Sequence, residues 1–177
     1  MKKVLIVLML FAITLSYISA SSENLQFNVH WVINNVKTIS MQVLPYSGSG
    51  SLPQDEHNNY LKTLEPLLNT TPYNVCLIRY ITNIKGTHKI EFSATPMEST
   101  LTLEEHPYSL YITYGSGFPV ILDVDPVEVD NSKAITFSVI GSGETTANIY
   151  LDAVLTDLDE MLIGEYSSTV TLERISE

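Results

Sequence analysis

Apolar and polar side chains alternate most regularly near the end of the chain, over residues 163–175. Successive side chains of an extended backbone point to opposite faces, so every second residue of this segment shares one face. β-Branched residues are frequent, Gly164 offers a turn, and no proline interrupts the run. The pattern predicts a half-buried strand whose inward face carries Tyr166, Ser168, Val170 and Leu172.

The same alternation recurs along most of the chain. Near the start it runs through Leu25, Phe27, Val29, Trp31 and Ile33. Further alternating runs predict strands over residues 37–44, 75–82, 89–95, 108–114, 120–124, 135–139 and 149–155. Short strands separated by turn residues, without a sustained helical period, indicate an all-β antiparallel sandwich. A closed barrel is the alternative.

Turn chemistry predicts how some of these strands are joined. Residues 83–86 predict a hairpin between strands 75–82 and 89–95. Hairpin turns also account for the Gly-Ser-Gly sequences at 115–117 and 141–143. Residues 45–72 are the least regular part, with a short helical turn expected over 59–64 before Pro66. A connection of this length is usually functional or disordered.

Residues 1–20 read as a secretory signal peptide. Two lysines precede an apolar run that is shorter than the roughly 20 residues of a membrane-spanning helix, and small residues follow at Ala20. We therefore expect one exported β-sandwich domain over residues 21–177, in the periplasm or at the cell surface, with no membrane span after cleavage. The formal net charge of −11 argues against nucleic acid as a partner, because phosphate contacts need clustered Lys and Arg.

No sequence motif indicates an enzyme. Cys76 is the only cysteine and lies in an apolar run, so we expect a small buried side chain and no disulfide. None of the Gly-Ser-Gly sequences has the Gly-x-Ser-x-Gly spacing of a nucleophile elbow. Residues 55–57 and 104–106 bring carboxylates beside a histidine, but without diagnostic metal spacing. We expect no catalytic residue, no cofactor and no metal site, with a bound calcium left open.

Tyrosines are the other candidates for binding. The chain has ten, and Tyr108, Tyr111 and Tyr114 are close together. On a strand, Tyr108 and Tyr114 share a face that could contact a glycan or a protein. The alternative is that these tyrosines are ordinary strand residues.

The ending Gly164-Glu165-Tyr166-Ser167-Ser168-Thr169-Val170-Thr171-Leu172 resembles the Gly-x-Tyr-x-x-x-Val-x-Leu close of bacterial fimbrial subunits and related pilin-like domains. The block from 73 to 96 is also similar to the middle of such subunits. The resemblance implies an immunoglobulin-like sandwich that lacks its last strand, which a neighbouring subunit supplies by donor-strand complementation. It implies a periplasmic chaperone and like subunits as partners.

On this resemblance the first alternating segment is the donor strand, with Leu25, Phe27, Val29, Trp31 and Ile33 as donor residues. The assembly groove is then lined by Gly164, Tyr166, Val170 and Leu172. The expected function is a non-enzymatic structural or adhesive subunit. A complete domain, in which 25–33 is simply the first strand, stays open and would be a stand-alone module that binds a glycan or host protein.

Overall fold

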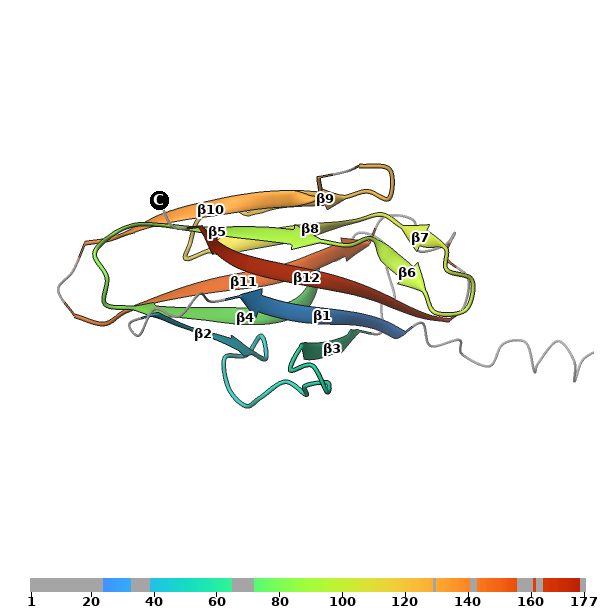
Figure 1. The fold of residues 1–177 in the computed structure, drawn as a ribbon, viewed down its shortest axis with the longest axis horizontal. Helices are drawn as coiled ribbons and strands as arrows, with labels where there is room; N and C mark the ends of the chain where they lie inside the picture. Colours follow the sequence, from blue (N-terminus) through green and yellow to red (C-terminus); the bar gives the residue numbers. More distant parts are fainter. Residues whose placement is uncertain are drawn as a thin grey trace, which may run out of the picture.

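The computed structural model describes residues 24–32, 39–64, 72–128, 130–140, 143–155, 161 and 164–175. The predicted signal peptide, residues 1–20, lies outside them. Every regular element in the described part of the chain is a β-strand. These strands form two sheets packed face to face (Figure 1). The fold is therefore all-β and sandwich-like, and among the described strands no ladder joins the two sheets into a barrel.

Sheet I has the strand order β10-β5-β12-β1-β3, with β6 and β7 continuing it beside β12 at one end. Its strands are β1 (Asn24–Val32), β3 (Tyr60–Leu64), β5 (Gly86–Ala94), β6 (Met97–Ser99), β7 (Glu105–His106), β10 (Ser132–Val139) and β12 (Glu165–Ile175). Sheet II has the order β2-β4-β11-β8-β9. Its strands are β2 (Ile39–Leu44), β4 (Tyr73–Thr82), β8 (Tyr108–Tyr114), β9 (Val120–Val124) and β11 (Thr145–Leu155).

One hydrophobic core fills the space between the sheets, and the period-two pattern decides which residues enter it. In β12 the inward residues Tyr166, Ser168, Val170 and Leu172 are all buried, as predicted. The same alternation buries every second residue of β8, β10 and β11. Cys76 is fully buried in this core and makes no disulfide.

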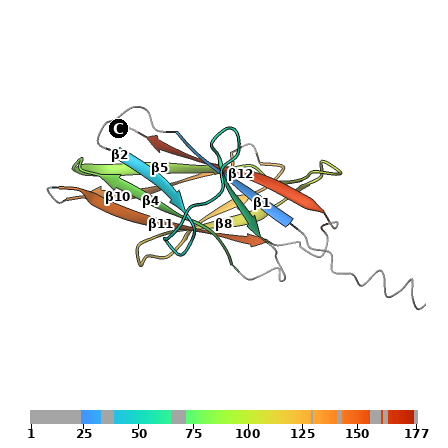
Figure 2. The same cartoon turned by 90° about the horizontal axis from the view of Figure 1, so that it is seen from below.

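The prediction of purely antiparallel sheets was wrong in one place. β1 runs parallel to β12, with Asn24 opposite Glu165 and Val32 opposite Glu173. Figure 2 shows the two strands side by side. Parallel neighbours need a long connection between them, and here the rest of the domain lies between β1 and β12 in sequence.

Two predicted hairpins were also wrong. β4 lies in sheet II and β5 in sheet I, so residues 83–85 carry the chain from one sheet to the other. β10 and β11 likewise belong to different sheets. The hairpin predicted at Gly115-Ser116-Gly117 is confirmed, because β8 pairs with β9. Local turn residues show that the chain bends, but not whether it returns to the same sheet.

The expected helical turn over 59–64 was wrong as well. Most of this segment is β3, which pairs antiparallel with β1 and buries Leu64. The start of the connection after β2 lies against sheet II, where a Cβ atom built on Gly48 would sit 3.3 Å from Leu77 Cδ2. There Tyr46 packs on Tyr150 with ring centroids 5.1 Å apart and the rings tilted by 55°, and donates a 3.1 Å hydrogen bond to Asp152.

Candidate functional site

The residues named from the pilin resemblance meet in the centre of sheet I. β1 lies between β12 and the short edge strand β3. Its backbone register places Leu25 opposite Tyr166, Val29 opposite Val170, and Trp31 opposite Leu172. The proposed donor strand is thus held within its own chain, beside the strand that carries the proposed groove residues.

Phe27 and Val29 are the two donor residues whose side chains the structure describes, and both are fully buried. Phe27 contacts Tyr108 of sheet II edge to face, with ring centroids 5.7 Å apart. The side chains of Leu25 and Trp31 lie outside the described part of the structure, as does the whole of Ile33. At least two members of this set therefore anchor β1 in the core.

The groove residues of β12 complete the same surface. Tyr166, Val170 and Leu172 are buried with 1%, 0% and 0% of their surface exposed. Gly164 precedes the strand, and a Cβ atom built there would sit 3.6 Å from Leu101 Cδ1, an ordinary contact. Neither space nor a positive φ requires glycine at this position. Another residue could therefore occupy the turn before β12.

A hydroxyl bridge links the two sheets beneath β1. Ser168 Oγ donates to the Thr95 carbonyl at 2.7 Å, and the Tyr108 hydroxyl lies 2.6 Å from Ser168 Oγ. Because the single Ser168 proton is used on Thr95, the Tyr108 hydroxyl must donate to Ser168. Burial raises the pKa of Tyr108 above its usual range, which keeps this donor protonated.

The bridge sits where β12 changes partner. Val170 to Ile175 pair with β5, whereas Tyr166 and Ser167 pair with β6. At the break, the Thr95 amide donates to the Thr169 carbonyl at 3.0 Å, and the Thr169 amide donates to Thr95 Oγ1 at 2.9 Å. Sequence alternation placed Ser168 inward but did not reveal this role; a serine among buried apolar positions was the available signal.

Tyr108 is 2% exposed, which excludes it from an exposed tyrosine surface and fits the alternative of an ordinary strand residue. Tyr114 is 40% exposed and stacks on Phe137 at 5.1 Å. Phe137 in turn stacks on His88, which is buried. This aromatic column joins the surface to the core at the end of the sandwich where β8 finishes.

His88 and Tyr80 form a second buried polar pair that sequence reasoning did not assign. His88 Nε2 lies 2.9 Å from the Ile84 carbonyl and must donate to it, which leaves Nδ1 to accept from the Tyr80 hydroxyl at 2.8 Å. Burial raises the pKa of Tyr80, an effect that nearby Arg174 opposes. The inward phase of His88 with Ile90 and Phe92 was the signal for this buried histidine.

The two candidate metal segments, residues 55–57 and 104–106, make contacts within the chain. Asp55 accepts hydrogen bonds from the amides of His57 and Asn59, and so closes its own turn. His106 packs against Tyr166 at 5.5 Å. Among the described residues no group of three or more His, Cys, Asp or Glu side chains gathers as metal ligands. Cys76 gains no activation, since burial raises the pKa of its thiol far above the usual range.

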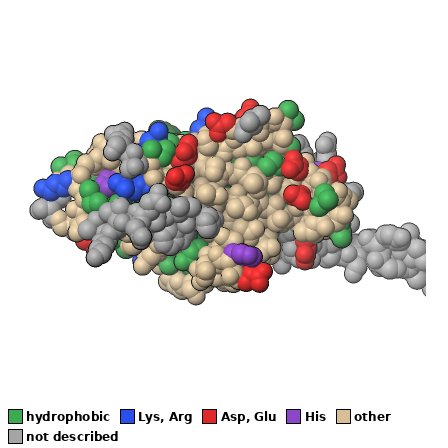
Figure 3. All heavy atoms as spheres, in the orientation of Figure 1, with side chains coloured by type: hydrophobic (Ala, Val, Ile, Leu, Met, Phe, Trp, Pro, Cys, Tyr) green, Lys and Arg blue, Asp and Glu red, His purple; other side chains and the backbone are tan. Residues whose placement is uncertain are grey.

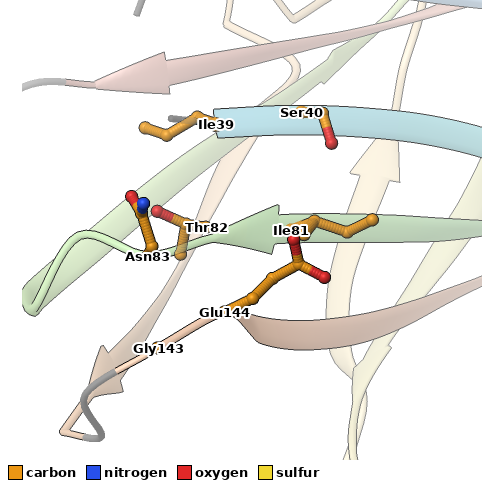
Figure 4. A pocket seen from close by; sticks show the side chains of 7 residues that line it. All are labelled: Ile39, Ser40, Ile81, Thr82, Asn83, Gly143 and Glu144. Atoms are coloured by element: carbon orange, nitrogen blue, oxygen red, sulfur yellow. The ribbon is translucent and has the colours of Figure 1, made fainter. Parts of the chain in front are cut away.

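Two small pockets open at opposite ends of the sandwich. One, of about 330 Å³, is shown in Figure 4, where Glu144 reaches toward Ile81; it is lined by Ile39, Ser40, Ile81, Thr82, Asn83, Gly143 and Glu144. The other, of about 210 Å³, is lined by Gln26, Thr63, Thr100, Glu165 and Tyr166. The lining of each pocket includes one carboxylate, from Glu144 or Glu165, and no histidine or cysteine.

Comparison with known proteins yields no relative: no protein-family model matches the sequence, and no curated protein matches it. Among the described residues, none of the segments is a helix of the length and apolarity that crossing a bilayer requires.

Proposed function

We propose that this protein is an exported, non-enzymatic structural or adhesive subunit of a cell-surface assembly. Its sandwich is pilin-like and immunoglobulin-like, and copies join by exchange of β1. The observation that carries the proposal is the place of β1, which fills the slot between β12 and β3 with Phe27 and Val29 fully buried. An identical strand from another copy can occupy the same slot.

Strand exchange is favoured by the way β1 is bound. It pairs with β12 over nine residues and with β3 over five. These main-chain hydrogen bonds do not depend on which copy supplies the strand, so exchange replaces each native contact with an equivalent one. The free-energy difference between closed and exchanged forms is therefore small compared with the barrier of removing β1.

The remaining parts of the proposal follow the expected route of export. Residues 1–20 direct secretion and are removed, and a periplasmic chaperone covers Tyr166, Val170 and Leu172 until β1 of another subunit arrives. An exposed groove of this kind would present an unpaired edge along β12, which proteins normally protect from aggregation.

A covalent lock on β1 tests the proposal. Gln26 and Ser167 are register partners and both are partly exposed. Neighbouring strands lie about 4.8 Å apart, within the roughly 4.4–6.8 Å that a disulfide spans between Cα atoms. We expect Gln26→Cys with Ser167→Cys to block assembly when oxidised and to restore it on reduction, measured by size-exclusion chromatography with light scattering.

The two single-cysteine variants are the matched controls, and both should assemble like the wild type. Buried Cys76 should not interfere, because its thiol is inaccessible. Assembly of the oxidised double variant at the wild-type level would rule out exchange of β1. So would a wild-type protein that stays monomeric at every concentration, with or without partial unfolding.

A stand-alone binding module for a glycan or host protein is the second candidate. It is favoured by the pairing of β1 within its own chain, which leaves the domain closed, and by exposed aromatic side chains at Tyr114 and Phe118. The two candidates differ in what the lock does: a binding module keeps its ligand when β1 is fixed, whereas the exchanging subunit loses assembly.

A further inference from the structure

The outer face of sheet II carries a carboxylate among aromatic side chains. Alternate residues of β8 and β11 enter the core, so those between them point outward. In this outward set Asp152 lies directly opposite Tyr111, and Tyr150 lies opposite Thr113. Ile121 of the edge strand β9 lies opposite Tyr111 and is 42% exposed. Directly opposed residues have Cβ atoms about 4.5–5.5 Å apart, so Asp152, Tyr111 and Ile121 form a row across three strands.

Tyr46 covers the other side of the Asp152 carboxylate. It comes from the connection after β2, packs on Tyr150 with ring centroids 5.1 Å apart, and donates to Asp152 Oδ2 at 3.1 Å. Asp152 thus lies between Tyr46 and Tyr111. All four side chains are partly exposed, so a molecule in solution can reach them. We name Tyr46, Tyr111, Tyr150 and Asp152 the Asp152 site.

The Asp152 site lacks a countercharge. Strands β8, β9 and β11 contain no Lys or Arg. Arg79 of β4 lies opposite Asn148, about 13 Å along the strand from Asp152. Among the described residues, none of the basic side chains lies within ion-pair distance of Asp152. Burial raises the pKa of Asp152, an effect that the hydrogen bond from Tyr46 opposes. Removing a carboxylate from water is costly unless a cation compensates it.

The rest of the surface also favours a cationic ligand. The chain has 20 Asp and Glu residues against 9 Lys and Arg. Figure 3 shows acidic side chains along the visible face, with Lys and Arg mainly toward its left. On the outer face of sheet II, Asp123 adds a second carboxylate one position beyond the row, where it accepts a 2.6 Å hydrogen bond from Ser109. Such a field attracts cations and repels anions.

We infer that the Asp152 site binds a quaternary ammonium group, with Asp152 as its counter-ion and the rings of Tyr111 and Tyr150 beside its methyl groups. A cation close to an aromatic face is attracted by the ring quadrupole. A primary ammonium carries three N–H donors that each need an acceptor, whereas a quaternary one has none. Aromatic rings beside a single carboxylate therefore suit the quaternary group. The ligand is soluble and of the choline type, because a lipid headgroup would bring its phosphate close to Asp123 and Asp152.

This inference goes beyond the proposed assembly role and does not rest on the exchange of β1. The Asp152 site belongs to sheet II and to the connection after β2, whereas β1 and its neighbours belong to sheet I. Ligand binding and assembly are measured separately. Loss of assembly in the oxidised Gln26→Cys/Ser167→Cys protein should therefore leave the ligand bound, and failure of either proposal leaves the other intact.

NMR titration with choline chloride at fixed ionic strength tests the site. We expect the amide signals of β8 and β11 to shift, with a dissociation constant on the order of 1 mM. The control is the neutral isostere of choline, in which carbon replaces nitrogen; it should bind about tenfold more weakly or less, because it keeps the shape and loses the charge. Equal binding of choline and its isostere would overturn the inference.

Two other probes distinguish the source and the class of ligand. Phosphocholine carries the charges of a lipid headgroup and should bind more weakly than choline, since its phosphate meets two carboxylates. Phosphocholine binding as tight as choline would overturn the assignment to a soluble ligand. Maltose serves as a neutral sugar, and it should not shift these signals. Shifts with maltose and none with choline would overturn the inference in favour of a glycan site.

Three variants assign the binding to the named side chains. Asp152→Asn keeps an acceptor for Tyr46 and should weaken choline binding by about tenfold or more. Tyr111→Leu keeps the apolar bulk without the ring and should weaken it by about two- to thirtyfold. Tyr114→Leu is the matched control, because Tyr114 belongs to the same strand but faces the other side of the sheet. It should bind choline like the wild type.

Thermal unfolding of each variant separates loss of the site from loss of the fold. The variants at the outward positions 111 and 152 should melt close to the wild type. Unchanged choline binding in Asp152→Asn would overturn the inference. So would a loss in Tyr114→Leu as large as the loss in Tyr111→Leu.

Discussion

The Tyr108 hydroxyl shows how much a single group depends on its partner. It is buried, donates to Ser168, and relies on Ser168 to pass the next hydrogen bond to the Thr95 carbonyl. A buried hydroxyl without a partner keeps the full cost of leaving water. The chain therefore holds its two sheets together at this point by a polar bridge within an otherwise apolar core.

In this bridge Tyr108 donates to Ser168 and Ser168 donates to Thr95. This donor order predicts that removing the Ser168 hydroxyl lowers the free energy of unfolding more than removing the Tyr108 hydroxyl. Ser168→Ala leaves the Tyr108 donor unpaired and should cost about 1–3 kcal/mol of unfolding free energy, whereas Tyr108→Phe should cost about 1 kcal/mol. The double variant should cost less than the sum, because its two losses share one contact. Urea denaturation of all three checks this, and equal single effects would contradict the assigned donor direction.

The buried tyrosines also predict loss of stability at alkaline pH. Burial raises the pKa of Tyr108 and of Tyr80, and burial with Asp152 raises that of Tyr46 to about 12. The folded state thus holds these protons more tightly than the unfolded chain, whose tyrosines titrate near pH 10. Their contribution is complete below about pH 10 and is lost as pH rises above it.

For Tyr108 alone the loss approaches about 1.4 kcal/mol per pH unit. The urea concentration at the unfolding midpoint should therefore decrease as the pH is raised from about 9 to about 11, a range that spans the pKa of a free tyrosine. Tyr108→Phe should show a shallower fall. A wild-type midpoint that does not change over this range would contradict the assignment.

At the scale of elements, alternation identifies a strand without naming its partner. The inward residues of β12 and β8 follow from local pattern, since a strand shows two faces wherever it lies. The pairing of β1 with β12 joins segments about 140 positions apart and has no local signal. β3 also shows that local pattern does not identify a partner strand. The sequence of residues 59–64 predicted a helical turn, and the segment is a strand because it pairs with β1.

The slot of β1 can be probed with a peptide. Phe27→Ala should destabilise the protein by about 3–5 kcal/mol by leaving a cavity in the core. A peptide spanning residues 23–34 should raise the melting temperature of this variant by filling the slot. The matched control is the same peptide with alanine at position 27, and equal shifts by both peptides would argue against donor-strand binding. Asn28→Ala, on the outward side, should have little effect.

At the scale of the whole molecule, composition reveals the net charge but not its distribution. The end of the sandwich where β6 and β7 project collects carboxylates from the hairpin of β6 and β7, from the connection between β9 and β10, and from the start of β12. These segments are far apart in sequence, so only the fold brings them to one end. The net charge argued only against nucleic acid as a partner, so the sequence-based interpretation missed this clustering of carboxylates at one end.

The direction of β1 has a consequence for the geometry of any exchanged assembly. β1 finishes opposite Glu173, at the end of the sandwich where β2 also begins opposite Thr82. A strand donated in its native, parallel direction keeps every native contact and therefore joins the corresponding ends of two copies. Reciprocal donation closes a symmetric pair. A longer chain of copies requires instead that each copy donates β1 to one neighbour and receives β1 from another.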